Sequence, residues 1–291
     1  MSCEPIWESR TVRLIFIVFF VAILPEFVFA GPLHDAARRG EVPLVKELIS
    51  QGAEVNDFKI QGRMSPLHLA AEYGHKEVVS LLIEEGARIN VKDQFGFTPL
   101  HLTAHGRYYE VAEVLVEKGA DIHLTTGTGL SLLHMAAVQG GVKIVDLMIK
   151  HGAIVHSSND DGFTPLHSAA LGGHVSVARL LSATAADLNA ITVGGQTSLA
   201  LACMVGHTDM VRFLLHEGVY VDTPDKEGFT PLHHAAGKGY IAIVKSLLAS
   251  GANILARSHL GLQPINMAAD NGYLAVLEIL LPYMNDKKRQ T

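Results

Sequence analysis

Histidine is the residue type in this chain with the greatest capacity for chemistry. The 291 residues include 16 histidines, and an imidazole can bind a metal or act as a general acid or base. Most of them recur at two fixed positions of a repeated segment, so a structural role is favoured over a site. Counted from the start of each repeated segment, the fourth position holds His34, His68, His101, His134, His167 and His233. The eleventh position holds His75, His174 and His207.

The motifs that mark metal and catalytic sites are missing from the sequence. There is no His-Glu-x-x-His and no Cys-x-x-Cys, so a zinc site has no support. Gly237-Lys238 precedes Gly239 where a phosphate loop needs Ser or Thr, and Gly127-Thr128-Gly129 lacks the third glycine of a dinucleotide motif. We therefore predict no catalytic residue, no metal ligand and no cofactor.

A nucleophile is equally hard to find. The two cysteines are Cys3, near the N-terminus, and Cys203, at a position where the repeat favours a small apolar side chain. A Cys-His nucleophile is not indicated, and the Gly-x-Ser-x-Gly elbow of serine hydrolases does not occur. An enzyme or a metal-binding protein is thus the least favoured function.

The segment that carries the histidines is a tandem repeat. Thr98-Pro99-Leu100-His101 returns at residues 164–167 and 230–233. Including degenerate copies, eight units start near residues 31, 65, 98, 131, 164, 197, 230 and 263. A fixed period of about 33 residues is the signature of a solenoid, so we predict one elongated domain over residues 31–284, followed by a polar tail at 285–291.

One unit shows how these elements would form. Ser65-Pro66 can open a first helix, because the hydroxyl caps a free N–H and proline is tolerated in the first turn. Gly74 ends that helix, and Val78, Leu81 and Leu82 then form the apolar stripe of a second helix. Residues 90–96 are expected to form a projecting turn that leads to the next unit.

The pattern Thr-Pro-Leu-His-x-Ala-Ala, followed by Gly-His and Gly-Ala-x-x-Asn, resembles the ankyrin repeat. Pro-Leu-His is intact at Pro32, Pro66, Pro99, Pro165 and Pro231, and Leu132 replaces proline in a sixth unit. The resemblance implies an all-α fold: an α-solenoid of paired antiparallel helices with projecting hairpin fingers. It also implies a concave face formed by the fingers and first helices, and a fourth-position histidine that links adjacent units.

Three units depart from this pattern. Arg107 stands where most units have glycine, and because Gly106 precedes it we expect the interhelix turn to shift by one residue. The fifth unit ends in Ala185 instead of glycine, and the sixth, from Thr197, lacks both the proline and the histidine. We predict a soft joint between units five and six, with early hydrogen exchange around residues 185–200; uniform protection along the array would contradict it.

Residues 1–30 have the order of a secretory signal. Arg10 and Arg13 precede an apolar run at residues 14–24, which Pro25 ends, and Ala30 offers a cleavage point. Eleven apolar residues are too few for a spanning helix, which needs about 20. We expect a signal peptide and a secreted protein. A signal-anchor at residues 14–24 and a cytoplasmic protein remain alternatives, because the chain lacks a disulfide framework and an Asn-x-Ser/Thr acceptor.

Composition limits the class of partner. The formal net charge is −6 at pH 7, with 29 acidic and 23 basic side chains, which offers no broad attraction for nucleic acid. We expect a monomer that binds a protein or an extended peptide. A membrane partner is expected only if the leader is not cleaved.

The partner-binding positions should be those that stacking leaves free, namely the finger tips, the residue before each Thr-Pro and the end of the first helix. The candidates are Tyr73, Phe95, Phe97, Leu130, Val138, Phe163, Leu171, Val193, Met204 and Val205. An apolar centre with a charged periphery suits a protein ligand. Alternatively, Phe97, Phe163 and Phe229 pack finger against finger.

These candidates lead to a mutational hypothesis. Replacing Phe97, Leu130 and Phe163 by serine or aspartate should abolish ligand capture without loss of helix, whereas loss of folding would favour packing. The function predicted from sequence is a protein-interaction scaffold or adaptor that binds on the concave ankyrin surface. The second hypothesis is a secreted or membrane-tethered ligand, such as a toxin-like or host-directed module.

Overall fold

The computed structural model describes residues 31–58, 63–184 and 186–289, with side chains given as far as residue 283. The predicted leader at residues 1–30 and Ala185 lie outside the described residues. Within the described ranges the chain forms sixteen helices, together with two isolated β-bridges, Thr125–Ser131 and Ile191–Thr197. The fold class is all-α.

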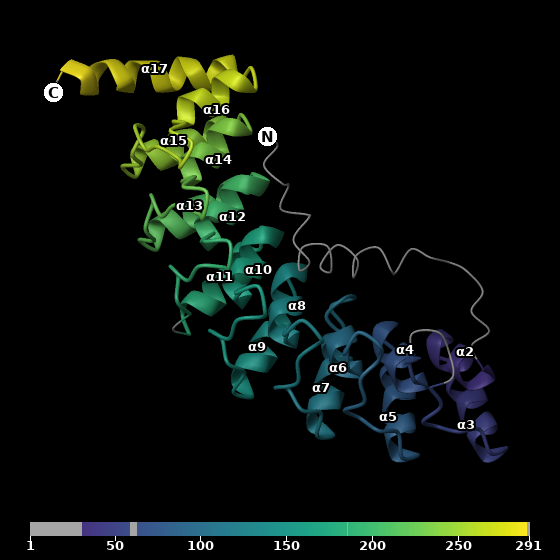
Figure 1. The fold of residues 1–291 in the computed structure, drawn as a ribbon. Helices are drawn as coiled ribbons and strands as arrows, with labels where there is room; N and C mark the ends of the chain where they lie inside the picture. The colour runs from purple at the N-terminus through teal and green to yellow at the C-terminus, as the bar shows by residue number, and fades with distance from the viewer. Residues whose placement is uncertain (1–30, 59–62, 185, 290–291) are drawn as a thin grey trace. The chain divides into compact units, whose positions relative to one another are not determined.

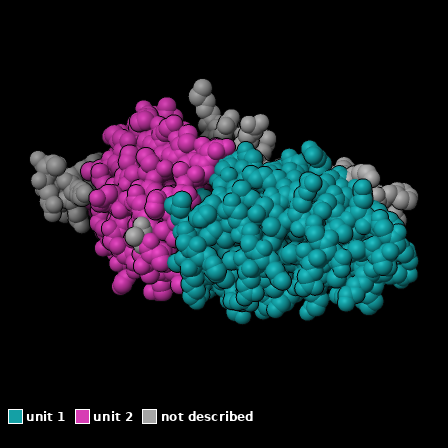
Figure 2. All heavy atoms as spheres, turned by 90° about the horizontal axis from the view of Figure 1, so that it is seen from below, with its two compact units in different colours: residues 1–154 teal, residues 155–291 magenta. Residues whose placement is uncertain are grey.

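The chain forms two compact units, residues 1–154 and residues 155–291 (Figure 2). Each unit contains four helix pairs in the part that the structure describes. A helix pair follows each of the eight predicted start points, and every first helix begins one residue after its start point. The domain boundaries and the single elongated array stay predictions.

In the first unit, each first helix packs on the next first helix and each second helix on the next second helix (Figure 1). The first helices are α2 Pro32–Arg39, α4 Pro66–Glu72, α6 Pro99–Leu102 and α8 Leu132–Gln139. The second helices are α3 Val42–Ser50, α5 Lys76–Glu84, α7 Tyr109–Glu117 and α9 Val142–Lys150.

The second unit has the same two rows of helices. Its first helices are α10 Pro165–Gly172, α12 Ser198–Val205, α14 Pro231–Gly237 and α16 Pro264–Asp270. Its second helices are α11 Val175–Ser182, α13 Thr208–His216, α15 Ile241–Ala249 and α17 Leu274–Arg289. All but α17 are short, so they depend on burial against their neighbours for stability.

In α4, α6, α10 and α14 the Pro-Leu-His motif starts the first helix through a reciprocal cap. The Ser65 hydroxyl accepts a hydrogen bond from the His68 backbone N–H at 3.3 Å, and His68 Nδ1 accepts one from the Ser65 backbone N–H at 3.0 Å. Because Nδ1 is an acceptor, Nε2 carries the proton and donates to the Phe97 carbonyl oxygen at 3.1 Å. For His68 this confirms the hydrogen bond near the helix cap that was predicted for the fourth-position histidine.

The interior of each unit is built from small and branched apolar side chains. Ala70 and Ala71 of α4 are fully buried, and so are Leu82 of α5 and Leu115 of α7. The small alanines allow neighbouring first helices to approach closely. Each buried leucine contributes about 1.5–3 kcal/mol of hydrophobic stabilisation.

The predicted shift of the interhelix turn at Arg107 is wrong. Arg107 itself adopts the left-handed conformation, with φ +55°, at the place where Gly74 has φ +79° in the preceding pair. The Tyr108 N–H donates to the Thr103 carbonyl at 2.9 Å, the same bond that His75 makes to Ala70. Gly106 is needed for a different reason, because a Cβ there would lie 2.1 Å from the Tyr108 ring.

Arg107→Gly is therefore expected to stabilise the protein. The left-handed conformation costs a non-glycine residue about 1–2 kcal/mol, and the greater freedom of glycine in the unfolded chain offsets part of the gain. We expect a net gain of up to about 1 kcal/mol in a urea unfolding experiment. Lys118→Gly is the control: Lys118 has φ −84°, so glycine there should destabilise. Equal effects of the two changes would contradict this account.

Candidate functional site

A side chain at the base of each finger closes the turn that shapes it. Asp93 Oδ1 accepts hydrogen bonds from the backbone N–H groups of Phe95 and Phe97, both at 2.8 Å. Asn159 and Asp225 make the equivalent bonds in their own fingers. The closed turn leaves Phe95 46% exposed and Phe97 7% exposed, although the two rings are only two residues apart.

Backbone hydrogen bonds join neighbouring finger tips within each unit. In the second unit the Val193 N–H donates to the Asp161 carbonyl at 2.8 Å, and the Lys226 N–H donates to the Gly194 carbonyl at 3.0 Å. In the first unit the Gly127 N–H donates to the Phe95 carbonyl at 3.0 Å. The tips are therefore held in a defined row and can present side chains with little loss of entropy on binding.

Gly162 is required for this close approach. Its φ is +77°, and an added Cβ would lie 2.8 Å from the Val193 backbone nitrogen, whereas Gly261, with φ +74°, has no atom within 4 Å of such a Cβ. Both Gly→Ala changes incur the left-handed cost, but only Gly162→Ala adds an overlap with backbone. We expect Gly162→Ala to destabilise by about 1 kcal/mol or more beyond Gly261→Ala in urea unfolding. Equal losses would show that the fingers do not need to approach so closely.

Three of the predicted partner-binding residues lie in the interior. Phe97, Leu130 and Phe163 are 7%, 3% and 4% exposed, so a partner cannot touch them on the folded protein. Phe97 and Phe163 meet the rings of His101 and His167 edge to face, with centroids 6.3 and 5.9 Å apart. Phe97 and Phe163 are therefore packing residues, and their ring contacts are with the histidines of the following first helices.

The other predicted residues reach the surface. Tyr73 and Phe95 of the first unit and Val193 and Val205 of the second are exposed. Val138, Leu171 and Met204 are half-buried. Their part in binding stays a prediction.

The sequence prediction also missed several exposed apolar side chains of the second unit, among them Ile191, Tyr220 and Leu260. Ile191 could have been found from its repeat phase, because it aligns with Lys92, Thr125, Ser158, Pro224 and Arg257 in the other fingers. An isoleucine at a position that is mostly polar or charged in the other fingers is the signal for an exposed apolar side chain.

Two carboxyl groups lie close in sequence to the exposed aromatic rings of the first unit. Glu72 is the last residue of α4, beside Tyr73, and Asp93 closes the finger that carries Phe95. Burial, and then the charge of Asp93, raises the pKa of Glu72. Burial also raises the pKa of Asp93, against the opposing hydrogen bonds from the finger N–H groups. These two partly buried carboxyl groups are thus close in sequence to the exposed rings of Tyr73 and Phe95, and the exposed Lys92 precedes Asp93.

A histidine and an aspartate pair in the second unit. His234 Nε2 lies 2.9 Å from Asp225 Oδ2, while Asp225 Oδ1 accepts the finger N–H groups of Glu227 and Phe229. Burial lowers the pKa of the adjacent His233, which donates to the Leu262 carbonyl at 3.0 Å. Asp225 Oδ1 thus binds the finger backbone and Asp225 Oδ2 binds His234 of α14, so the pair has a structural role.

Groups that could bind metals or act as nucleophiles were also considered. Within the described ranges, no three histidine, cysteine or acidic side chains are placed to hold a metal ion. The Cys203 thiol is fully buried, and burial raises its pKa, which disfavours the reactive thiolate. No helix among the described residues is long and apolar enough to cross a membrane.

Comparison with known families gives one match. The family model described as "Ankyrin repeats (3 copies)" matches residues 33–126, 119–192 and 185–258. A comparison with curated proteins finds no match. The matched segments together cover residues 33–258, well over half of the chain.

Proposed function

Because the chain belongs to the ankyrin repeat family, whose members are generally protein–protein interaction modules and typically non-enzymatic, we propose that it is a scaffold or adaptor. It binds a protein or an extended peptide without covalent chemistry. The contact surface is formed by the finger tips and the ends of the first helices in each unit.

The observation that supports this proposal most is the exposure of apolar side chains at positions that the repeat does not use for stacking. In the first unit these are Tyr73 and Phe95, and in the second they are Ile191, Val193 and Val205. Large apolar side chains on a polar surface mark interaction sites, and aromatic residues dominate binding energy at interfaces. Since the fingers are held by backbone hydrogen bonds, the surface is ordered before a partner arrives.

The charge around Phe95 suggests the chemistry of the partner of the first unit. Burial is the main cause of the raised pKa of Glu72, and the charge of Asp93 adds to it, so the two carboxyl groups repel each other. A lysine or arginine from a partner would relieve this repulsion and could also lie against an exposed ring. A basic peptide is therefore the ligand that suits this surface.

The function can be tested with variants that keep the fold. A Tyr73→Ser/Phe95→Ser double variant and a Val193→Ser variant remove exposed apolar groups only. The control is Val142→Ser, because Val142 is 39% exposed but lies at the start of a second helix. Proteins that copurify with each bait from the native cell are quantified by mass spectrometry, and the Kd of the best candidate is then measured.

We expect the first-unit double variant or Val193→Ser to lower the binding affinity for one partner by about tenfold or more. A tenfold loss corresponds to roughly 1.4 kcal/mol of binding free energy. Val142→Ser should retain that partner, and circular dichroism should be the same for all four proteins. A partner that every variant retains with equal affinity would contradict the proposed surface.

We further propose that the protein is exported and acts outside its own cell, as a ligand or a host-directed module. This part rests on residues 1–30 alone, which are outside the described residues. N-terminal sequencing of the protein from its own cell would test it. A start at Gly31 would support export, whereas Met1 or Ser2 in a soluble fraction would contradict it.

A further inference from the structure

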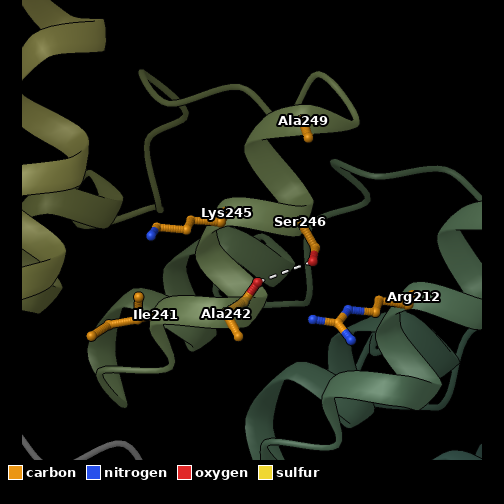
Figure 3. Close-up of a pocket in the computed structure, with 6 residues that line it drawn as sticks. All are labelled: Arg212, Ile241, Ala242, Lys245, Ser246 and Ala249. Carbon is orange, nitrogen blue, oxygen red and sulfur yellow. Dashed lines mark hydrogen bonds between the residues drawn. The ribbon is translucent and has the colours of Figure 1, made fainter.

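A groove of about 480 Å³ lies between α13 and α15 in the second unit (Figure 3). Its lining consists of Arg212 from α13 and Ile241, Ala242, Lys245, Ser246 and Ala249 from α15. In Figure 3, Arg212 reaches from its helix toward Ser246, and Lys245 points away from Arg212. The groove thus has an arginine on the α13 side, and two alanines and a serine together with Ile241 and Lys245 on the α15 side.

Repeat phase explains why this groove is not filled. Ser246 lies 33 residues after Phe213, and Arg212 lies 33 residues after Arg179. In the preceding pair of second helices, the guanidinium carbon of Arg179 lies 5.2 Å from the centroid of the Phe213 ring. Phe213 is 7% exposed there. Between α13 and α15 the arginine recurs, but a serine replaces the ring that should lie beneath it.

The side chains around Ser246 do not replace the missing ring. Ala242 and Ala249 end in methyl groups, and the Ser246 hydroxyl donates to the Ala242 carbonyl oxygen at 3.0 Å. The free volume is ample for one aromatic ring, because an engineered cavity of about 150 Å³ already holds benzene. The groove is therefore a ring-sized space with an arginine at its edge.

Arg212 remains available for a further contact. Its nearest carboxylate is Asp209 on the same helix, at 3.5 Å, and the side chains of this pair are 60% and 85% exposed. Exposed ion pairs of this kind are weak, so a ligand carboxylate can compete with Asp209. A guanidinium can stack on a ring with its face and pair with a carboxylate through its edge.

We propose that this groove binds an aromatic side chain accompanied by a carboxylate, presented by a protein partner. The ring takes the place that Phe213 holds beneath Arg179 in the preceding pair, and the carboxylate pairs with Arg212. This surface is formed by second helices, so it is separate from the fingers and first helices. It gives the second unit a second docking point, for an acidic and aromatic segment.

The test uses the isotope-labelled full chain and a small probe, 3-phenylpropionate, which combines one ring with one carboxylate. We expect saturable NMR shifts at Arg212, Ser246 and Ala249, with a Kd of roughly millimolar for so small a ligand. Propionate, which lacks the ring, and 3-phenylpropanol, which lacks the charge, should each bind about tenfold more weakly or worse.

Three variants decide between this site and adventitious binding. Ser246→Phe supplies the missing ring in cis, so it should abolish the shifts and keep or raise Tm. Arg212→Gln should lower the affinity for 3-phenylpropionate about tenfold. Arg179→Gln is the matched control, since Phe213 already occupies the space beneath Arg179, and it should bind the probe like the wild type.

An absence of saturable shifts in the wild-type chain would overturn the proposal. So would equal binding by Arg212→Gln and Arg179→Gln, a comparison that stands even if Ser246→Phe does not fold. The outcome is independent of the proposed function, because Phe95→Ser and Val193→Ser leave this groove intact.

Discussion

Phe97→Ser is expected to destabilise the protein by about 3–5 kcal/mol, whereas Phe95→Ser should cost less than about 1 kcal/mol. The two rings belong to one finger and differ in burial: Phe97 is 7% exposed and Phe95 is 46% exposed. Serine at 97 leaves a cavity beside His101 and places a hydroxyl in an apolar space. Serine at 95 removes only a ring that water already reaches.

Urea unfolding followed by circular dichroism measures both losses. For the same reason Leu130→Asp and Phe163→Asp should unfold the chain at much lower urea than the wild type, because a buried unpaired carboxylate is strongly unfavourable. This reverses the hypothesis that these positions bind the partner without affecting the fold. A Phe97→Ser protein with a wild-type midpoint and lost partner binding would restore that hypothesis.

Acidification should destabilise the first unit as the pH falls from about 6.5 toward about 4. Burial lowers the pKa of His68 and of His101 from 6.5 to about 4, and backbone hydrogen bonds oppose this only in part. The unfolded chain therefore binds more protons than the folded chain in this interval, and stability rises with pH. The full contribution is present above pH 6.5 and is lost as the pH falls through the folded pKa.

The size of the acid effect follows from the two shifts. Each corresponds to roughly 3 kcal/mol, since one pKa unit is about 1.4 kcal/mol. The raised pKa values of Glu72 and Asp93 act in the opposite sense, because protonating these carboxyls at low pH removes an unfavourable charge. The histidines should dominate, because they are almost completely buried whereas both carboxyl groups are partly exposed.

Urea midpoints measured from pH 7.5 to pH 4.5 test this prediction. A His68→Gln/His101→Gln double variant is expected to be less stable at neutral pH and to show a much flatter pH dependence. The same slope in the wild type and the double variant would show that these imidazoles are not responsible.

The repeat register and the first helices could be predicted because their signals are local. The starts at residues 65, 98, 164 and 230 combine a Ser or Thr cap, a proline in the first turn and a histidine at the fourth position, and the cap contacts the histidine, as in Ser65 and His68. The family and the all-helical fold class predicted from this pattern are confirmed. Local chemistry of this kind needs no knowledge of the neighbouring repeats.

The inward and outward positions of the finger could not be predicted in the same way. Phe95 and Phe97 are both aromatic and differ only in how the Asp93 turn directs them. The prediction that the turn at Arg107 shifts by one residue was wrong for a related reason. The hydrogen bond from the Tyr108 N–H to the Thr103 carbonyl is equivalent to the bond from His75 to Ala70, and in both turns the preceding residue, Arg107 or Gly74, is left-handed.

The groove beneath Arg212 shows a third limit of sequence reasoning. The exchange of Phe213 for Ser246 is visible only after the repeats are aligned. Sequence alone does not tell whether neighbouring helices close over the missing ring. The structure shows that α13 and α15 leave the space open.

Site-specific photo-crosslinking is the most direct test of the central claim that the finger tips and first-helix ends bind a protein. A photoreactive phenylalanine analogue is placed at Phe95 in one protein and at Val142, on a second helix, in another. Irradiation in the native cell should join the Phe95 protein to one defined partner, at a lysine- or arginine-rich segment, and should give no such product from Val142. The same products from both positions, or none from Phe95, would contradict the account.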